Sequence, residues 1–371
     1  MKERQVKAAV VTEQSDGFHI EELSIDEPRA GEVLVRIVAT GVCPADIAVR
    51  DGGFGTSVPA VPGHEGAGVV EAVGDDVTSI TPGDHVVLSY DTDGTCRNCA
   101  EGNPAYCSAF ARYNFDGVRG SDGSSPLRRN GENVGLFFGQ SSFSTHSIAN
   151  ERQIVRVPDD VPLELLGPLG CGIQTGCGAV MNSLDPNAGT SIAIFGVGAV
   201  GLSAVMGAVV SGCTTVVAVD LLEERLELAN RLGATHTIDA GSTDDLSGEI
   251  RSITDGGVDN TLDTTSVPSV VRAAVDATRV PGTCGLLGGA PTEPDPNLDM
   301  GRILSGRAIR GISQGDSIPQ VFIPRLIDLY RQGRFPFDEL VEFYDFEDVN
   351  RAAEDLEAGR TIKPVLRIGE V

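Results

Sequence analysis

The sequence predicts two domains, a β-rich one and a doubly wound α/β one. Its 371 residues exceed the roughly 100 to 200 expected of a single domain. Residues up to about 160 are dense in glycine and in short Val/Ile-rich runs, which is typical of strands joined by irregular loops. From residue 163 onward short apolar runs alternate with helical patterns, which indicates βαβ units.

In the β-rich part, residues 31–38 and 66–73 predict strands. Residues 114–133 are rich in Gly, Ser, Asp and Arg, and we expect a surface loop there. Residues 363–368 predict a last strand that returns to this domain.

The α/β part begins with an apolar strand over 190–195, then glycines, then a helix up to residue 210. A second strand is predicted over 215–220 and a helix over 221–232. Residues 261–263 are expected to end another strand, and residues 282–288 predict one more. The tail predicts helices over 323–331 and 346–356.

The chain is strongly acidic, with 53 acidic and 28 basic residues and a net charge of −25. Nucleic acids and anionic membranes require a basic face, so neither is an expected partner. The first 14 residues lack the apolar core of a signal peptide, and no run approaches a membrane span. We therefore expect a cytoplasmic protein.

The acidity has two interpretations. Negative charge keeps any protein soluble at the expense of self-repulsion. Alternatively, a surface with only three lysines among 371 residues is adapted to high salt, where carboxylate repulsion is screened. Composition alone does not decide between them.

A glycine pattern follows the first strand of the α/β part. Gly196, Gly198 and Gly201 precede Asp220 at about the spacing of the dinucleotide-binding fingerprint. The glycines permit a tight turn and close approach of a pyrophosphate to a helix N-terminus, while the aspartate accepts hydrogen bonds from ribose hydroxyls. An aspartate there repels a 2′-phosphate, so the pattern predicts NAD rather than NADP.

Three of the eight cysteines lie in one loop rich in Gly and Pro. Cys96, Cys99 and Cys107 are suited to a tetrahedral structural zinc, and Asp93 lies where a fourth ligand would be. The alternative is a site that has lost its affinity and holds free thiols.

A second set of metal-binding types is dispersed along the chain. Cys43, His64 and Cys171 each lie in a short Gly-containing string. Singly, each is more typical of packing than of chemistry. Together they offer two thiolates and an imidazole, which leave one corner of a tetrahedron for substrate, as in the alcohol dehydrogenase site.

These strings, with the runs at 137–143, 168–175 and 333–337, resemble the zinc-dependent medium-chain alcohol dehydrogenases, and most of all the bacterial aryl- (benzyl-) alcohol dehydrogenases. The resemblance covers nearly the whole chain. It implies a GroES-like catalytic domain formed by residues 1–172 with 314–371, and a Rossmann NAD-binding domain over 173–313. It also implies a homodimer or homotetramer.

The resemblance implies roles for single residues. Cys43, His64 and Cys171 would hold a catalytic zinc, with Asp46 orienting His64 and Glu65 within reach as a transient ligand. The residues implied beside NAD, in addition to the glycines and Asp220, are Thr175, Val200, Arg225 at the adenosine ribose and Lys363 at the pyrophosphate.

This sequence departs from the family pattern at the proton path. The residue after the first zinc cysteine is usually His or Arg and the next Ser or Thr, but here they are Pro44 and Ala45. Ala48 replaces a histidine that sometimes continues the relay, and Asp93 replaces a cysteine. Without that hydroxyl, water or Glu65 would have to accept the substrate proton.

The predicted reaction is NAD-linked interconversion of an aryl, allylic or medium-chain primary alcohol and its aldehyde. The resemblance implies a substrate pocket with walls from Ser89, Tyr90, Phe137 and Phe138. Two alternatives stay open. One is a polyol or secondary-alcohol dehydrogenase, and the other is an NAD-binding relative that has lost its chemistry.

Overall fold

The computed structural model describes residues 4–13, 16–288 and 295–370. The chain divides into two compact units. Unit 1 contains the chain up to Cys171, the segment Ile318–Pro324 and the chain from Asp338 onward. Unit 2 contains Gly172–Ser317 and Arg325–Phe337.

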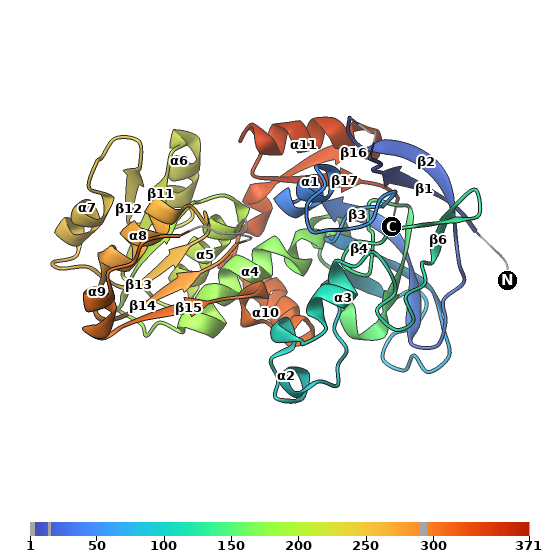
Figure 1. Ribbon diagram of the computed structural model, residues 1–371, viewed down its shortest axis with the longest axis horizontal. Helices are drawn as coiled ribbons and strands as arrows, with labels where there is room; N and C mark the ends of the chain where they lie inside the picture. The colour runs from blue at the N-terminus through green and yellow to red at the C-terminus, as the bar shows by residue number, and fades with distance from the viewer. Residues whose placement is uncertain (1–3, 14–15, 289–294, 371) are drawn as a thin grey trace. The chain divides into compact units, whose positions relative to one another are not determined.

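A seven-stranded sheet forms the centre of unit 1, in the order β16-β17-β3-β4-β5-β9, with β8 also paired to β3. The predicted return of the chain end is confirmed, because β17 pairs antiparallel with β3 (Figure 1). Residues Val33, Val35 and Ile37 of β3 are fully buried. The strands are β3 (Glu32–Gly41), β4 (Gly66–Val73), β5 (His85–Leu88), β8 (His146–Asn150), β9 (Ile154–Arg156), β16 (Val341–Asp345) and β17 (Lys363–Arg367).

A second, four-stranded sheet has the order β1-β2-β6-β7. It corrects the prediction of a plain loop over 114–133, because β6 and β7 form an antiparallel hairpin within and just beyond that range. Asn130 and Gly131 turn the hairpin with φ of 53° and 86°, as an Asn-Gly pair favours. The strands are β1 (Arg4–Val10), β2 (His19–Ile25), β6 (Leu127–Arg129) and β7 (Glu132–Val134).

Short helices connect these strands. In unit 1 they are α1 (Pro44–Arg50), α2 (Arg97–Ala100), α3 (Phe110–Asn114) and α11 (Val349–Glu357). The helix predicted from residue 346 starts with a 3₁₀ turn, Phe346–Asp348, and is α-helical from Val349. Helix α10 (Pro319–Arg331) covers the helix predicted over 323–331.

Unit 2 contains a six-stranded parallel sheet in the order β12-β11-β10-β13-β14-β15, which confirms the doubly wound prediction (Figure 1). The predicted helix over 221–232 begins only at Glu223. The strands are β10 (Ser191–Phe195), β11 (Thr215–Asp220), β12 (His236–Asp239), β13 (Val258–Asp263), β14 (Thr278–Leu286) and β15 (Arg307–Gly311). The helices are α4 (Gly172–Gly178), which a π-helical turn Ala179–Leu184 extends, α5 (Ala199–Val210), α6 (Glu223–Arg231), α7 (Leu246–Ile253), α8 (Pro268–Ala277) and α9 (Met300–Leu304).

None of the helices in the described ranges is long and apolar enough to cross a membrane.

Candidate zinc and cofactor sites

Four side chains from distant parts of unit 1 converge at one point. Cys43, His64, Glu65 and Cys171 each offer one ligand atom, and these atoms all lie within 4.8 Å of one another. Cys43 ends the loop after β3, His64 and Glu65 lead into β4, and Cys171 follows a 3₁₀ turn, Gly167–Gly170. The structure therefore brings together all three predicted ligands of the catalytic zinc and the predicted transient ligand.

Helix α1 holds Asp46 against this cluster. Pro44 occupies the first turn, where a fixed φ and a missing N–H suit a helix. The Asp46 carboxylate accepts hydrogen bonds from the Cys43 N–H at 3.0 Å and the Gly63 N–H at 2.8 Å. It also lies 2.8 Å from His64 Nδ1. Asp46 thus fixes the segments that carry two of the predicted ligands.

The far side of the imidazole lacks a protein partner. His64 is 1% exposed, and within the described chain its Nε2 is buried without a hydrogen bond. A buried imidazole nitrogen in this state is costly unless a ligand completes it. Two cysteines and a carboxylate within 4.8 Å make that ligand a metal ion, and the set suits zinc.

The charges of the cluster stabilise one of its thiolates. A hydrogen bond from Cys171 and the charges of Lys363 and His64 hold the pKa of Cys43 well below its ordinary value. Burial opposes the imidazolium form of His64, but the Asp46 carboxylate and the Cys43 thiolate outweigh it and keep the pKa of His64 high. The cluster therefore stabilises the Cys43 thiolate, the form that binds metal, whereas the raised pKa values of His64 and Cys171 mean that a metal ion would displace protons from both.

Glu65 faces a buried lysine as well as the ligand cluster. Lys363 Nζ donates to Glu65 Oε1 at 2.9 Å and Oε2 at 3.0 Å, and to the Val42 carbonyl at 3.2 Å. Burial raises the pKa of Glu65. Gly41 makes room for this pair, since a Cβ there would lie 1.9 Å from Glu65 Oε2. Lys363, expected at the cofactor pyrophosphate, is thus engaged by Glu65 in this structure.

The four predicted pocket residues are buried, and two of them contact the first cluster. Tyr90, Phe137 and Phe138 are at most 4% exposed, and Ser89 donates to the Gly170 carbonyl at 2.7 Å. Phe137 and Phe138 contact the His64 ring, with centroids 5.2 Å and 4.6 Å away.

The predicted structural zinc ligands also converge. Asp93, Cys96, Cys99 and Cys107 place their ligand atoms within 4.8 Å of one another. Cys96 Sγ lies 3.6 Å from Cys99 Sγ and 4.0 Å from Cys107 Sγ. Zinc–sulfur bonds of about 2.3 Å in a tetrahedron place the sulfurs about 3.8 Å apart, so the spacing fits zinc.

Backbone N–H groups prepare Asp93 for this site. Its Oδ1 accepts hydrogen bonds from Cys96 N–H and Thr95 N–H, both at 2.8 Å, which lower its pKa to about 2. The Cys96 thiol receives similar help, since Ser108 N–H donates to its Sγ at 3.4 Å. The aspartate is an anionic group held in a position where it could act as a ligand.

The predicted glycine loop of unit 2 connects β10 to α5. Gly196 has φ of 81° and lies against Thr264 and Thr265, and a Cβ on Gly201 would lie 1.9 Å from the Gly196 carbonyl oxygen. A Cβ on Gly198, by contrast, would approach only Arg225 Nη1, at 3.9 Å. The loop is closely packed at Gly196 and Gly201 but open at Gly198, and the open position leaves the space that a pyrophosphate requires.

The other predicted cofactor residues lie in the same unit, except Lys363. Asp220 ends β11 and accepts hydrogen bonds from Val197 N–H and Leu221 N–H, both at 2.8 Å. Arg225 Nη1 is 3.8 Å from Asp220 Oδ2, and its Nε is buried without a hydrogen bond in the described chain. Val200 lies on α5, and Thr175 lies on α4.

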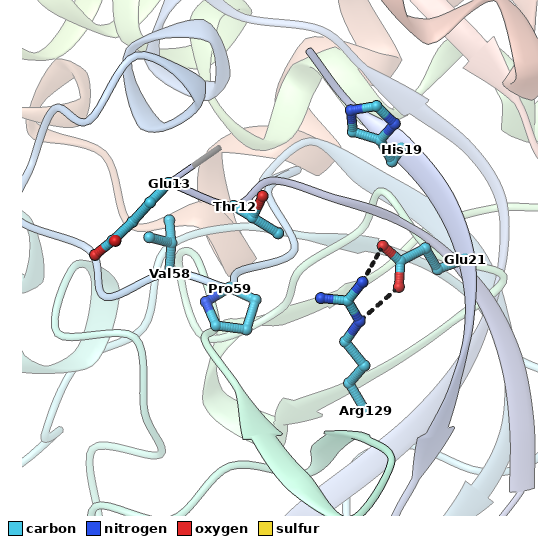
Figure 2. A pocket seen from close by; sticks show the side chains of 7 residues that line it. All are labelled: Thr12, Glu13, His19, Glu21, Val58, Pro59 and Arg129. Atoms are coloured by element: carbon cyan, nitrogen blue, oxygen red, sulfur yellow. Dashed lines mark hydrogen bonds and ion pairs between the residues drawn. The ribbon is translucent and has the colours of Figure 1, made fainter. Parts of the chain in front are cut away.

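A separate cavity of about 590 Å³ lies in unit 1. Figure 2 shows Arg129, the arginine among its described lining residues, paired through two contacts with Glu21. Because that cation is neutralised, the cavity presents no built anion site, and we assign it no role. Its lining residues are Thr12, Glu13, His19, Glu21, Val58, Pro59 and Arg129.

Two supporting residues of the first cluster were not predicted. Gln140 Nε2 donates to the carbonyls of His64 and Ser89, and its Oε1 accepts from Gly66 N–H. Gly41 supplies the space for Glu65. Neither has a local signal, because a single glutamine and a glycine at a strand end occur in many structural roles.

Comparison with known proteins agrees with this geometry. The alcohol dehydrogenase GroES-like domain family matches residues 29–159, and the zinc-binding dehydrogenase family matches residues 199–331. A geraniol dehydrogenase of Castellaniella defragrans is 46% identical over 362 residues, which cover 97% of each chain. The chain belongs to the zinc-dependent medium-chain alcohol dehydrogenases. The predicted family and the predicted GroES-like and Rossmann fold class are confirmed.

Solved structures of this dehydrogenase family match over almost the whole chain. An alcohol dehydrogenase zinc-binding domain protein from Burkholderia ambifaria has 50% identity and a TM-score of 0.96, with 99% of each chain covered. A benzyl alcohol dehydrogenase from Acinetobacter calcoaceticus has 45% identity and a TM-score of 0.94, covering 98% of this chain and 99% of the other.

Proposed function

We propose that this dehydrogenase interconverts primary alcohols and aldehydes with NAD, and that its substrates carry the hydroxymethyl group on an sp² carbon. The observation that carries the reaction is the convergence of Cys43, His64 and Cys171 around an unpartnered imidazole nitrogen. Geraniol and benzyl alcohol, named in the two relatives, share that substrate chemistry.

Cys43, His64 and Cys171 would hold the catalytic zinc, with Asp46 orienting His64 through Nδ1. Zinc bound there acts as a Lewis acid that polarises the substrate oxygen. Bound NAD⁺ would supply the hydride acceptor, and the hydroxyl proton of the alcohol would leave to a base. Glu65 pairs with Lys363 in this structure and is close enough to the ligand cluster to serve as a further metal ligand.

The base is water or Glu65. Ala45 and Ala48 carry no titratable or hydroxyl group, so α1 supplies no relay. Glu65 is within reach of the ligand cluster, and burial raises its pKa toward the range where a carboxylate accepts a proton. The expected consequence is a rate that rises with pH.

NAD would bind to unit 2. Gly196, Gly198 and Gly201 leave room for the pyrophosphate at the start of α5, and Asp220 would accept hydrogen bonds from the ribose hydroxyls. The buried Nε of Arg225 has a hydrogen bond to give to the adenosine ribose. Thr175 and Val200 are proposed as further contacts of the cofactor.

We propose that Asp93, Cys96, Cys99 and Cys107 hold a structural zinc. All four corners are then filled by protein, so the site is closed to substrate. We also propose a cytoplasmic homodimer or homotetramer. The eight cysteines are unpaired, as suits thiolate ligands in a reducing compartment.

The test is NADH formation by zinc-loaded protein with benzyl, cinnamyl, hexyl and ethyl alcohols and a polyol. We expect turnover of benzyl and cinnamyl alcohol, loss of that turnover in Cys171→Ser, and retention in Cys213→Ser, a cysteine outside both clusters. Preference for the polyol would contradict the proposed substrate class. NAD binding without turnover of any alcohol would contradict the proposed reaction.

A further inference from the structure

Two aromatic rings enclose the imidazole of His64. Phe138 stacks on one face, with ring centroids 4.6 Å apart and planes at 27°. Phe137 meets the ring edge-on, with centroids 5.2 Å apart and planes at 86°. Both phenylalanines are buried, at 4% and 0% exposure, so these contacts exclude water.

These contacts restrain rotation of the His64 ring, which, among the described residues, one hydrogen bond alone opposes before a metal binds. Asp46 holds Nδ1, and a metal ion would hold Nε2, on the far side of the ring. Rotation about the Cβ–Cγ bond turns the ring plane and swings Nε2, and before a metal binds the Asp46 hydrogen bond at Nδ1 is the polar contact that opposes this rotation. Flat contact with a ring face adds a second restraint against the same rotation. Because the nitrogen lone pair lies in the ring plane, the orientation of that plane decides how well it meets the metal.

The backbone that carries Phe138 adopts a strained conformation. Phe138 has φ of 52° and Ser141 has φ of 53°, in the left-handed region that bulky residues avoid. Such strain persists only where the surroundings fix it, and it is concentrated at functional sites.

Hydrogen bonds fix this segment against the His64 segment. Ser142 N–H donates to the Gly63 carbonyl at 3.0 Å, and Phe143 N–H donates to the Pro62 carbonyl at 3.1 Å. Gln140 Nε2 donates to the His64 carbonyl at 3.1 Å. The loop over 137–143 is therefore tied directly to the backbone that carries the histidine.

We propose that Phe138 is a positioning residue, which fixes the imidazole plane of His64 for metal binding, with Phe137 as the second restraint. The inference rests on the proposed catalytic metal site and deepens it. It differs from the pocket-wall role implied by resemblance, because the ring acts through His64 and needs no contact with substrate.

The experiment measures zinc release to a chelator in full-length variants. The phase that belongs to the catalytic site is the one absent in Cys171→Ser. Phe138→Leu keeps an apolar side chain but removes the flat face, and we expect it to release this zinc about 10 to 100 times faster. Phe138→Tyr keeps the ring and should release zinc at the wild-type rate. The phase that belongs to the Asp93 site should not change.

Phe143→Leu is the matched control. Phe143 lies in the same loop and is fully buried, but its ring meets Phe18 at 5.7 Å. Equal release rates in Phe138→Leu and Phe143→Leu, whether fast or slow, would overturn the proposal. If Phe138→Leu does not fold, Phe138→Met replaces it, with the same expectation and the same overturning result.

A second readout is the visible spectrum of protein with Co²⁺ at the catalytic site. Phe138→Leu should change its band positions, and Phe138→Tyr should restore them, whereas a purely structural role would leave the spectrum unchanged. Both readouts are independent of turnover. Wild-type protein that retains this zinc but oxidises no alcohol would contradict the proposed function, and the release rates would still decide the role of Phe138.

Discussion

Replacing Lys363 by methionine should destabilise unit 1 strongly. The ammonium group is 2% exposed and its partner Glu65 is fully buried, with N–O distances of 2.9 and 3.0 Å. Methionine fills similar space but leaves the Glu65 carboxylate without its counter-ion. Cys43 and Asp46, the other acidic groups of the cluster, cannot replace the positive charge of Lys363. His64 is the remaining nearby group that could offset the Glu65 carboxylate.

The expected loss of stability follows from removing one partner of a buried ion pair. Such changes cost about 3–5 kcal/mol, and for a unit of this size this is a fall in Tm of roughly 6–20 °C. Burial opposes the Lys363 charge, but Glu65 and Cys43 hold the pKa of Lys363 above its ordinary value. Because the pKa is raised, the contribution is complete below pH about 10 and is lost only as pH rises further.

The assay is thermal unfolding of Lys363→Met, Glu65→Gln and the double variant. The double variant removes the unpaired Glu65 charge, so it should recover most of the lost stability. Arg367→Met is the control, since Arg367 lies on the same strand but pairs with Glu164 at 49% and 36% exposure. It should lower the free energy of unfolding by less than about 1 kcal/mol. A melting curve of Lys363→Met close to that of Arg367→Met would refute the reasoning. NAD affinity measured on the same variant tests the separate expectation of a pyrophosphate contact.

Three further predictions concern other parts of the molecule. Asp93→Ala should lose the structural zinc without loss of the catalytic one, as metal analysis would show, whereas Asp93→Cys should retain both; two zinc ions in Asp93→Ala would contradict the assigned ligand. Restoring a hydroxyl with Ala45→Thr should raise kcat by up to about 10² and weaken the rise of kcat with pH. Steady-state kinetics that show no gain in kcat would contradict the interpretation that the missing hydroxyl limits proton transfer. Raising KCl to 1 M, where the Debye length is about 3 Å, should raise Tm if the charge of −25 is a salt adaptation, and an equal Tm at low salt would favour the solubility interpretation.

The strands and helices with strong periodicity were predictable, and the weak ones were not. Strand β4 has the predicted bounds, and β10 and β11 lie within a residue of theirs. The β6–β7 hairpin was missed because Gly, Ser and Arg dominate the composition around it. Its local signal was the Asn130-Gly131 turn, flanked by Leu127 and Val134 as a paired apolar position.

The residues that could bind metal were predictable from the sequence, but the residues that hold them in place were not. Several cysteines, a histidine and an aspartate with glycines close by seldom occur together outside metal sites. Gly41 and Gln140 act through space, over separations of 24 and 76 residues from Glu65 and His64. Such contacts depend on tertiary packing, which no local pattern in one sequence encodes.

Pro44 accounts for a site that keeps its ligands while it lacks the usual hydroxyl relay. Proline at the first turn starts α1 immediately after Cys43, and the capping box between Cys43 and Asp46 then fixes that turn. The same Asp46 carboxylate holds His64, so one short helix links two proposed zinc ligands. None of these contacts transfers a proton from substrate, because the Ala45 side chain has no donor or acceptor. On the proposed function, the site thus separates two tasks: α1 positions two proposed zinc ligands, and the proton would leave through water or Glu65.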